Sequence, residues 1–559
     1  MSNETVRKRS GQLIALGAAL ATLAVSPFAS LDPINLIKIV FLSAIAFSLL
    51  PMTMMLYSET KYLQEKILIF TALSFVFWLT LVLLTSDAPL SQQFWGVFGR
   101  NTGYLTYFAL LAFLVAAALV QRLETYVLLV RTLILTSLPV LAYAIIQSLG
   151  MDPISWSQLA PFGTLGNINF SSAFFGMSAI AMTVVAISPG KSLILRICLS
   201  ILVITKLLVV ASTGSIQGLM IYVAGVAVIL FFFVTSNNKL KFLKMPYLVL
   251  GIVGFATSIA GLLNQGPLAR FIFGETVLFR YDYWYAGWMM SLRNPLFGVG
   301  LDSYGDWYRE LRGEVATLRT VPDRITNSAH NIYLDISSGG GIPLLSLYFI
   351  FLALALRAIL RHLRHQKSFD PTFTALASVW FAYQIQAAIS INQVGVGVWG
   401  WAFTGALIGY EKSKLVRNGK DRIKSQPKYS RGDQLPLKAA LLSIMGFIIG
   451  AALAFVPYQA DVRFRDAQEA GSISEMARAS KSLGSTAYHR ELALDAAIQS
   501  NDVAQAREIV DDLIATFPRN FMAWRVQQVL VDSTPQEREA AFLSLKEFDP
   551  FNPEIVQVK

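Results

Sequence analysis

Long apolar runs separated by short polar connections fill the chain up to about residue 457. A helix of about 20 apolar residues crosses the ~30 Å hydrocarbon core of a bilayer, and backbone polar groups in lipid are satisfied within such helices. The pattern therefore predicts an all-α polytopic membrane protein. The runs predict about thirteen spans, at residues 11–30, 34–57, 66–85, 102–120, 125–149, 167–189, 193–211, 216–235, 246–264, 330–360, 373–391, 396–411 and 438–457. Gly339-Gly-Gly-Ile-Pro343 interrupts one span and predicts an unwound or closely packed segment.

Lysine and arginine residues alternate with the spans. Cytoplasmic connections of membrane proteins are enriched in these residues. One set of connections carries them, among them Arg7-Lys8-Arg9, Lys191 with Arg196, and Arg361 to Arg364. The alternate set lacks them, at residues 30–33, 150–166, 212–215 and 392–395. The N-terminus is therefore predicted to be cytoplasmic, with the long 265–329 loop and the C-terminal tail on the outer side.

Composition agrees with a membrane protein and narrows its chemistry. The 559 residues are 54% hydrophobic and 14% charged, with a net charge of +11, whereas soluble domains carry about 25% charged residues. Because the basic residues follow the topology, no nucleic-acid partner is expected. The single cysteine, Cys198, excludes an intrachain disulfide and a cysteine-based zinc site, and no cofactor or metal is expected.

The first apolar run is interpreted as a retained span rather than a cleaved signal.

Residues 458–559 are charged and alanine-rich, with helical periodicity and no apolar run. Leu494 to Trp524 resembles a tetratricopeptide helix pair, and Phe548 to Pro553 repeats its Phe/Pro/Asn element about 31–32 residues later. We interpret the chain as a transmembrane domain at 1–457 and a small outer helical-repeat domain at 458–559. Such a domain favours a docking or packing surface, for example for a protein partner, over a catalytic unit.

The 265–329 loop holds seven arginines and no lysine, balanced by seven acids. Arg280 is flanked by aromatic residues from Phe279 to Trp284, which predicts a helix entering or lying along the membrane interface. A guanidinium there suits bidentate contact with phosphate oxygens. The remaining loop arginines of interest are interpreted as solvated surface ion pairs: Arg309, Arg312, Arg319 and Arg324.

His330 lies where this polar loop becomes an apolar helix. Asn327 or Ser328 is predicted to cap that helix, which would place His330 in its first turn at the outer face. Asn331 and Asp335, four residues apart, are predicted to share one helix face. His330 and Asp335 are about 140° out of phase on a helix, so no catalytic dyad is predicted.

Other polar residues at the outer ends of spans are candidates for binding a diphosphate or sugar. Membrane-embedded cations face a cavity or a partner, which predicts a cavity role for Lys206, whereas Lys38 equally fits snorkelling to the surface. Arg100 opens a span from outside, where a helix N-terminus favours an anion. Asn167 and Asn169 fit either ligand contacts or ordinary turn and cap positions.

In this order along the chain, these pieces resemble the O-antigen ligase and O-antigen polymerase superfamily of bacterial membrane glycosyltransferases. The resemblance covers roughly residues 100–345, and its motifs are Gly99–Gly103, Gly163–Phe170, Arg280–Trp284, Asn294–Gly300 and Ser328–Asp335. One element departs from the family: Ser212 to Gln217 lacks an arginine that many members have, and Lys206 is a candidate substitute.

The resemblance implies a donor glycan on undecaprenyl diphosphate in the outer leaflet of the bacterial cytoplasmic (inner) membrane. His330 would be the essential histidine and general base, and Arg280 the loop arginine. Direct displacement at the anomeric carbon would invert its configuration without a metal. The acceptor hydroxyl, on a glycan, a lipid, a cell-wall polymer or a protein, stays open, as does ligase against polymerase.

Two other classes of function compete with a transferase. A transporter or flippase of lipid-linked sugars would use the intramembrane cations to bind a headgroup, and an inverted repeat would favour it. A scaffold would use only the tail. No inverted repeat is visible, and the charges gather at one outer face, which favours the transferase.

Overall fold

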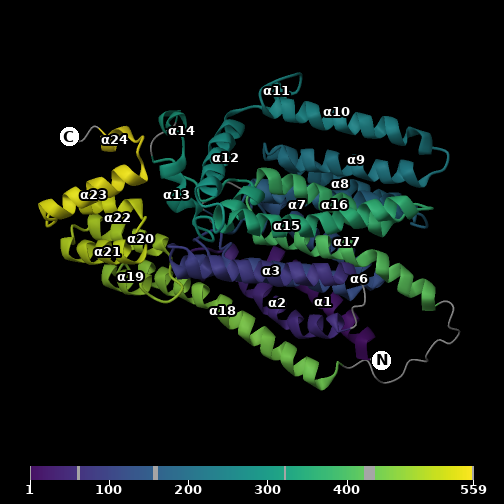
Figure 1. The fold of residues 1–559 in the computed structure, drawn as a ribbon, viewed down its shortest axis with the longest axis horizontal. Coiled ribbons are helices and arrows are strands. Elements are labelled where there is room, and N and C mark those ends of the chain that lie inside the picture. Colours follow the sequence, from purple (N-terminus) through teal and green to yellow (C-terminus); the bar gives the residue numbers. More distant parts are fainter. Residues whose placement is uncertain are drawn as a thin grey trace.

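The computed structural model describes residues 2–58, 63–154, 156, 161–319, 323–420 and 435–556. All regular elements in these ranges are helices, and none is a β-strand (Figure 1). The predicted all-α class is confirmed.

A helix overlaps each of the thirteen predicted spans, although the first ends at Leu23 instead of residue 30: α1 (Ser2–Leu23), α2 (Asn35–Tyr57), α3 (Leu63–Thr85), α5 (Tyr104–Val120), α6 (Leu123–Ser148), α7 (Ile168–Ile187), α8 (Leu193–Ser212), α9 (Gln217–Ser236), α10 (Lys244–Leu262), α15 (Ile332–His365), α16 (Pro371–Ile389), α17 (Val394–Lys420) and α18 (Leu437–Glu469). Within the described ranges, nine helices are long and apolar enough to cross a membrane, and α5 is a shorter apolar helix. The chain is a polytopic membrane protein, and the count of thirteen spans stays a prediction.

Shorter helices gather at one end of the bundle. They are α4 (Leu90–Trp95), α11 (Ala269–Ile272), α12 (Glu275–Arg293), α13 (Tyr304–Leu311) and α14 (Glu314–Arg319), while η1 (Lys241–Leu243) precedes α10. Helix α12 runs across the ends of the bundle helices (Figure 1). We call this end, which carries residues 265–329, the loop end. The N-terminus lies at the opposite end (Figure 1), as the orientation prediction requires; which end faces the cytoplasm stays a prediction.

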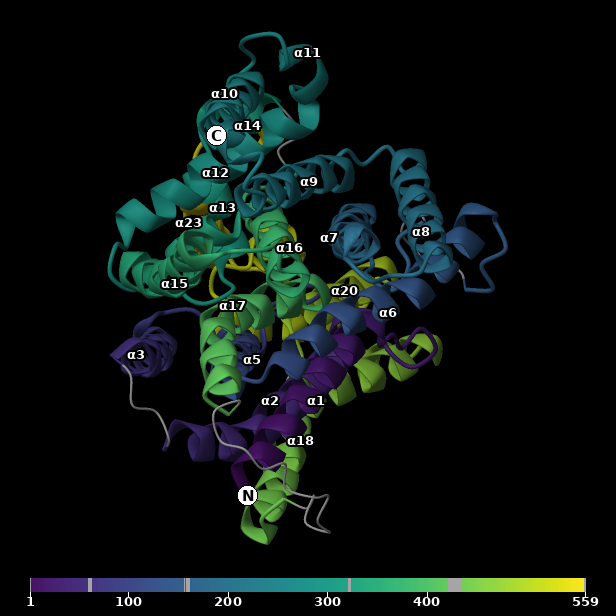
Figure 2. The ribbon, with the colours of Figure 1, turned by 90° about the vertical axis from the view of Figure 1, so that its right-hand side faces the viewer.

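The bundle packs around α5, which is buried along nearly its whole length and is surrounded by α2, α3 and α17 (Figure 2). In lipid, close helix contact depends on small residues rather than on apolar burial. A Cβ at Gly405 of α17 would lie 2.0 Å from the Leu114 carbonyl oxygen, and one at Gly409 would lie 2.6 Å from that of Ala118. Only glycine permits α5 and α17 to approach this closely.

Helix α15 is broken near its start. Gly341 has φ 78° and ψ 172°, so the interruption predicted at Gly339 to Pro343 is confirmed. Beyond the break, the amide of Ile342 donates to the Pro295 carbonyl at 2.8 Å. A Cβ on Gly341 would lie 1.9 Å from the Leu296 carbonyl oxygen. The break therefore seats the 295–300 segment of the loop against the helix that follows His330.

The tail begins inside a helix, because α18 continues without interruption through the boundary predicted at residue 457. Its further helices are α19 (Ile473–Ser480), α20 (Ala487–Gln499), α21 (Val503–Thr516), α22 (Phe521–Val529), α23 (Pro535–Phe548) and α24 (Pro553–Val556). Figure 1 places them at the loop end, beside α13. The predicted helical character is confirmed, whereas the tetratricopeptide assignment stays a prediction.

A buried ion cluster joins the tail to the loop. Asp549 is fully buried and accepts hydrogen bonds from Arg312 Nη2 at 2.7 and 2.8 Å and from Arg309 Nη1 at 3.0 Å. Arg312 is itself 1% exposed. The prediction of solvated surface pairs is wrong for these two arginines, because the tail removes them from water.

Replacing Gly341 by alanine tests the break in α15. We expect Gly341→Ala to lower the free energy of unfolding by at least about 2 kcal/mol, since a side chain at this φ is strained and meets Leu296. A Cβ on Gly251 of α10 would have no neighbouring atom within 4 Å, so Gly251→Ala is the control and changes stability by no more than about 1 kcal/mol. Equal thermal unfolding of the two variants in detergent would contradict the packing described.

Asp549→Ala tests the docking of the tail. Removing this carboxylate leaves Arg312 buried without its counter-charge, so we expect about 3–5 kcal/mol less stable docking. The measurement is the rate of limited proteolysis of the tail in native protein. Asp511→Ala is the control: Asp511 is 59% exposed and pairs with Arg507 at 3.8 Å, and such surface pairs contribute about 0–1 kcal/mol. Unchanged proteolysis of Asp549→Ala would show that the cluster does not hold the domains together.

Candidate active site

His330 precedes α15 instead of lying in its first turn. Asn331 is the N-cap: its Oδ1 accepts the amides of Tyr333 at 3.0 Å and Leu334 at 3.2 Å. His330 itself has φ 51°, in the left-handed region. The prediction that Asn327 or Ser328 caps the helix is wrong, because three capping residues stand close together and only the fold selects one.

Asp335 folds the His330 loop onto α15. Its Oδ2 accepts Ser328 Oγ at 2.7 Å, and its Oδ1 accepts the Ala329 amide at 2.8 Å. Ser328 Oγ in turn accepts the amide of His330 at 2.9 Å. These bonds hold the backbone of His330 rather than its ring.

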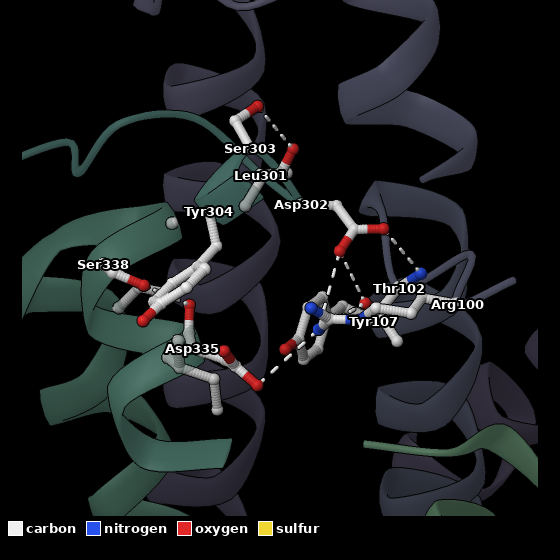
Figure 3. A pocket seen from close by; sticks show the side chains of 12 residues that line it. Arg100, Thr102, Tyr107, Leu301, Asp302, Ser303, Tyr304, Asp335 and Ser338 are labelled. Atoms are coloured by element: carbon white, nitrogen blue, oxygen red, sulfur yellow. Dashed lines mark hydrogen bonds and ion pairs between the residues drawn. The ribbon is translucent and has the colours of Figure 1, made fainter. Parts of the chain in front are cut away.

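Arg100 links this loop to two other segments. Its Nη2 lies 3.6 Å from Asp302 Oδ1 and 3.6 Å from Asp335 Oδ2, and its Nη1 donates to the Asn327 carbonyl (Figure 3). Burial disfavours its charge, but the two carboxylates outweigh burial and raise the pKa of Arg100. The anion predicted near Arg100 is therefore supplied by the protein itself.

Asp302 anchors the turn that carries Arg100. Its Oδ2 accepts the amides of Val97 at 2.8 Å and Thr102 at 3.1 Å, and its Oδ1 accepts Thr102 Oγ1 at 2.9 Å (Figure 3). The sequence analysis missed Asp302, because one acid among seven in a polar loop carries no local sign of burial. The only sign in the sequence that Asp302 is buried was its position shortly after the turn Gly298-Val-Gly300.

The His330 ring is neutral and free to react. It stacks on Tyr283 with ring centroids 5.3 Å apart, and within the described residues its ring nitrogens make no hydrogen bond. Burial, together with the positive charges of Arg280 and Arg100, lowers the pKa of His330 to about 4. At neutral pH the imidazole is therefore unprotonated, which is the state a general base requires.

Arg280 is a half-buried cation of α12 that faces the same histidine. Its Nε donates to the Ile389 carbonyl at 3.1 Å and its Nη1 to the Thr276 carbonyl at 3.5 Å, and burial lowers its pKa. No carboxylate among the described residues pairs with it. Other arginines of the loop do have carboxylate partners: Arg293, Arg309, Arg312 and Arg319. Arg280 thus keeps an uncompensated charge suited to an anionic ligand.

The two intramembrane lysines have protein partners. Lys38 is fully buried and donates to the carbonyls of Thr22 at 2.7 Å and Ala24 at 2.8 Å, so it does not snorkel to the surface. Lys206 is fully buried as well and donates to Ser137 Oγ at 2.5 Å and Ser178 Oγ at 2.7 Å. The Lys38 ammonium therefore binds the C-terminal end of α1, and the Lys206 ammonium links α8 to α6 and α7.

The predicted asparagine ligands have structural contacts. Asn167 caps α7 by accepting the amide of Asn169 at 2.8 Å, and Asn169 Oδ1 accepts Ser215 Oγ at 2.8 Å. Asn331 is occupied as the cap of α15. In the described residues, none of these side chains makes a hydrogen bond to the side chain of His330 or Arg280.

Buried amides without partners lie near the loop end and were missed from the sequence. Gln217, at the start of α9, is 4% exposed, and neither of its amide atoms has a hydrogen-bond partner. Gln386, near the end of α16, is 2% exposed with an unpartnered Oε1. Helices α9 and α16 pack against each other, and these two side chains have amide atoms that no described residue hydrogen-bonds. Buried amides of this kind are costly without a ligand or water.

Fold and site define a polytopic membrane protein with a neutral histidine and an uncompensated arginine at one end of its bundle. Residues 199–349 match the model of the O-Antigen ligase family, so the predicted resemblance is confirmed over that part of the chain. The match includes Arg280, His330 and Asp335 and indicates an O-antigen ligase-type membrane enzyme. No curated protein matches the sequence. Among the described residues, no group of three His, Cys, Asp or Glu is placed to hold a metal.

Titration of His330 tests the electrostatics of the site. The chain has four histidines, so NMR of histidine-labelled protein resolves them, and His330→Ala assigns the signal. We expect no titration of His330 between about pH 5 and 8. In Arg280→Gln the pKa rises toward 6.5, because a neighbouring cation that disfavours the imidazolium is gone. Arg270→Gln, which removes an exposed arginine of the same loop, is the control. A wild-type midpoint near 6.5 would contradict the burial of the ring.

Proposed function

We propose that this protein transfers a glycan from undecaprenyl diphosphate to an acceptor hydroxyl on the outer face of the bacterial cytoplasmic membrane, in the synthesis of a cell-envelope polysaccharide. The observation that carries the proposal is the juxtaposition of a neutral, unbonded His330 with the uncompensated Arg280. A base and an anion-binding cation are the two groups that such a transfer requires.

His330 acts on the acceptor. One ring nitrogen takes the proton of the acceptor hydroxyl as its oxygen attacks the anomeric carbon of the donor. The bond between that carbon and the phosphate oxygen breaks, and the electron pair leaves with undecaprenyl diphosphate. Because one displacement occurs, the configuration at the anomeric carbon inverts. A diphosphate is a good leaving group, so this step requires little acid assistance.

Arg280 acts on the leaving group. Its guanidinium lies on α12 at the end of the membrane helices, where the diphosphate of a lipid-linked donor would reside. Negative charge grows on the diphosphate as the bond breaks, and a cation held in a water-poor site stabilises that charge more than it would in water. Binding of the dianionic group also offsets the effect of Arg280 on His330 and raises the basicity of the imidazole.

Arg100 is a positioning residue in this proposal. It holds the loop that carries His330 to Asp302 and Asp335 instead of contacting the donor. The buried amides of Gln217 and Gln386 are candidates to bind hydroxyls of the donor glycan, since each has unused hydrogen-bonding capacity.

The test is transfer by purified protein given an undecaprenyl diphosphate-linked glycan and a panel of acceptors. We expect His330→Ala to reduce kcat at least ~100-fold, as for loss of a general base. His365→Ala is the matched control, since His365 is an exposed histidine at the opposite end of α15. Arg280→Lys retains the charge but loses the fork, and we expect a smaller loss than in Arg280→Ala.

Equal transfer by wild type and His330→Ala would exclude His330 as the base. If neither protein transfers the glycan while both bind the donor and move it across proteoliposome membranes, the chain is a transporter of lipid-linked sugars.

A further inference from the structure

A cavity of about 650 Å³ lies between the loop and the tail. Its walls come from the turn around α4, from the α13 region and from α20 to α22 of the tail. The volume lies within the ~300–1,000 Å³ range of ligand sites in proteins. Asn327 and Ile325, which belong to the His330 loop, line the cavity at one side. Whatever binds there reaches the segment that carries the histidine.

Two carboxyl groups of the cavity keep unused hydrogen-bond acceptors. Asp306 Oδ2 accepts Gln92 Nε2 at 2.6 Å, and Glu491 Oε1 accepts Asn520 Nδ2 at 2.6 Å. Each carboxyl can accept several more hydrogen bonds. Burial raises the pKa of Asp306 to about 6 and raises that of Glu491, because both groups lie in a poorly solvated space. Hydroxyl groups of a ligand would satisfy them.

An aromatic pair forms another wall of the cavity. Phe98 and Tyr488 are stacked with ring centroids 4.3 Å apart, and Tyr488 is 40% exposed. The Tyr488 hydroxyl makes no hydrogen bond among the described residues. A flat apolar ring beside carboxyl acceptors suits a ligand with one apolar face and a rim of hydroxyls, which is the surface of a pyranose.

The cations of the cavity are already neutralised. Arg309 binds Asp549 at 3.0 Å, Arg525 binds Asp323 at 3.2 Å, and Arg519 binds Glu310. Among the described residues, Asp306 and Glu491 make no ion pair, whereas the three arginines of the cavity all do. The cavity therefore offers no uncompensated cation to a phosphate or another anion. The charge here is opposite in character to that around Arg280, where no carboxylate among the described residues pairs with the cation.

We propose that this cavity binds the acceptor as a neutral, hydroxyl-rich glycan chain, stacked on Tyr488 and hydrogen-bonded to Asp306 and Glu491, with its terminal hydroxyl at His330. The proposal rests on the proposed function and narrows its acceptor from any hydroxyl to a neutral polysaccharide. Donor and acceptor approach from opposite sides, the anionic donor past Arg280 and the neutral acceptor past the tail. The tail is then part of the acceptor site.

Binding of free sugars tests the site without requiring transfer. The measurement is saturation-transfer NMR on the full-length protein in nanodiscs, with maltotetraose, mannotetraose and chitotetraose as neutral probes. Tetragalacturonate is the anionic probe, and a capped Gly-Ser octapeptide represents a protein acceptor. We expect at least one neutral probe to bind and the other two classes not to bind. For a neutral probe that binds wild type, the affinity falls at least ~10-fold in Tyr488→Ala and in Glu491→Gln.

Three further variants make the result specific. Tyr488→Phe keeps the ring and restores binding to within about threefold, which separates lost stacking from misfolding. Glu508→Gln removes an exposed carboxylate of α21 outside the cavity and binds as wild type does. His330→Ala also binds the probe, since this variant retains Tyr488 and Glu491 in the cavity wall. In the transfer assay, Tyr488→Ala raises the acceptor KM with no change in the donor KM.

The possible results separate this site from the proposed function. Binding of the peptide or of tetragalacturonate in place of the neutral sugars would overturn the acceptor assignment, as would no binding of any neutral probe. Sugar binding lost in Tyr488→Ala, in a protein that transfers nothing, would support the site and refute the transferase. Transfer with wild-type acceptor KM in Tyr488→Ala and Glu491→Gln would support the transferase and refute the site.

Discussion

A buried arginine held between two aspartates organises the loop end of this protein. Arg100, Asp302 and Asp335 come from three segments far apart in the chain, and each lies in a poorly solvated interior. A buried charge is costly unless it is paired, and removing one partner leaves the others uncompensated. The three segments therefore adopt one arrangement relative to each other. The loop bearing His330 is part of that arrangement, because Asp335 and Arg100 bind its backbone directly.

The arginines of the loop end differ in whether a carboxylate pairs with them. Arg100 and Arg312 are matched with carboxylates and hold segments together, whereas Arg280 is matched only with carbonyl oxygens. A carbonyl orients a guanidinium without cancelling its charge. Burial keeps His330 neutral, and the positive potential that remains adds to this effect and would attract a diphosphate. In the proposed mechanism, one cation therefore influences both the base and the leaving group.

Buried ion pairs also connect the tail to the membrane domain. Asp549 binds two arginines of the loop, so α13 and the residue that follows it are fixed from the side of the tail as well as from the bundle. The cavity between the two parts exists only because both are docked. A site built by two domains can present an acceptor to chemistry that takes place on the membrane domain.

Local patterns in the sequence determined the helices, their apolar faces and the break at Gly341, because lipid requires each span to satisfy its own backbone bonds. They also singled out His330 and Arg280, which stand out in an otherwise apolar chain. Tertiary structure alone decided which acid meets which arginine, since a loop of seven arginines and seven acids has many equivalent pairings. In the tertiary structure Arg100, a candidate ligand from the sequence, binds two aspartates, and His330 precedes its helix. Arg312 is buried beneath the tail, which the sequence patterns indicated as a separate domain. These pairings depend on contacts between residues far apart in the chain, and the local periodicity of the sequence does not specify such contacts.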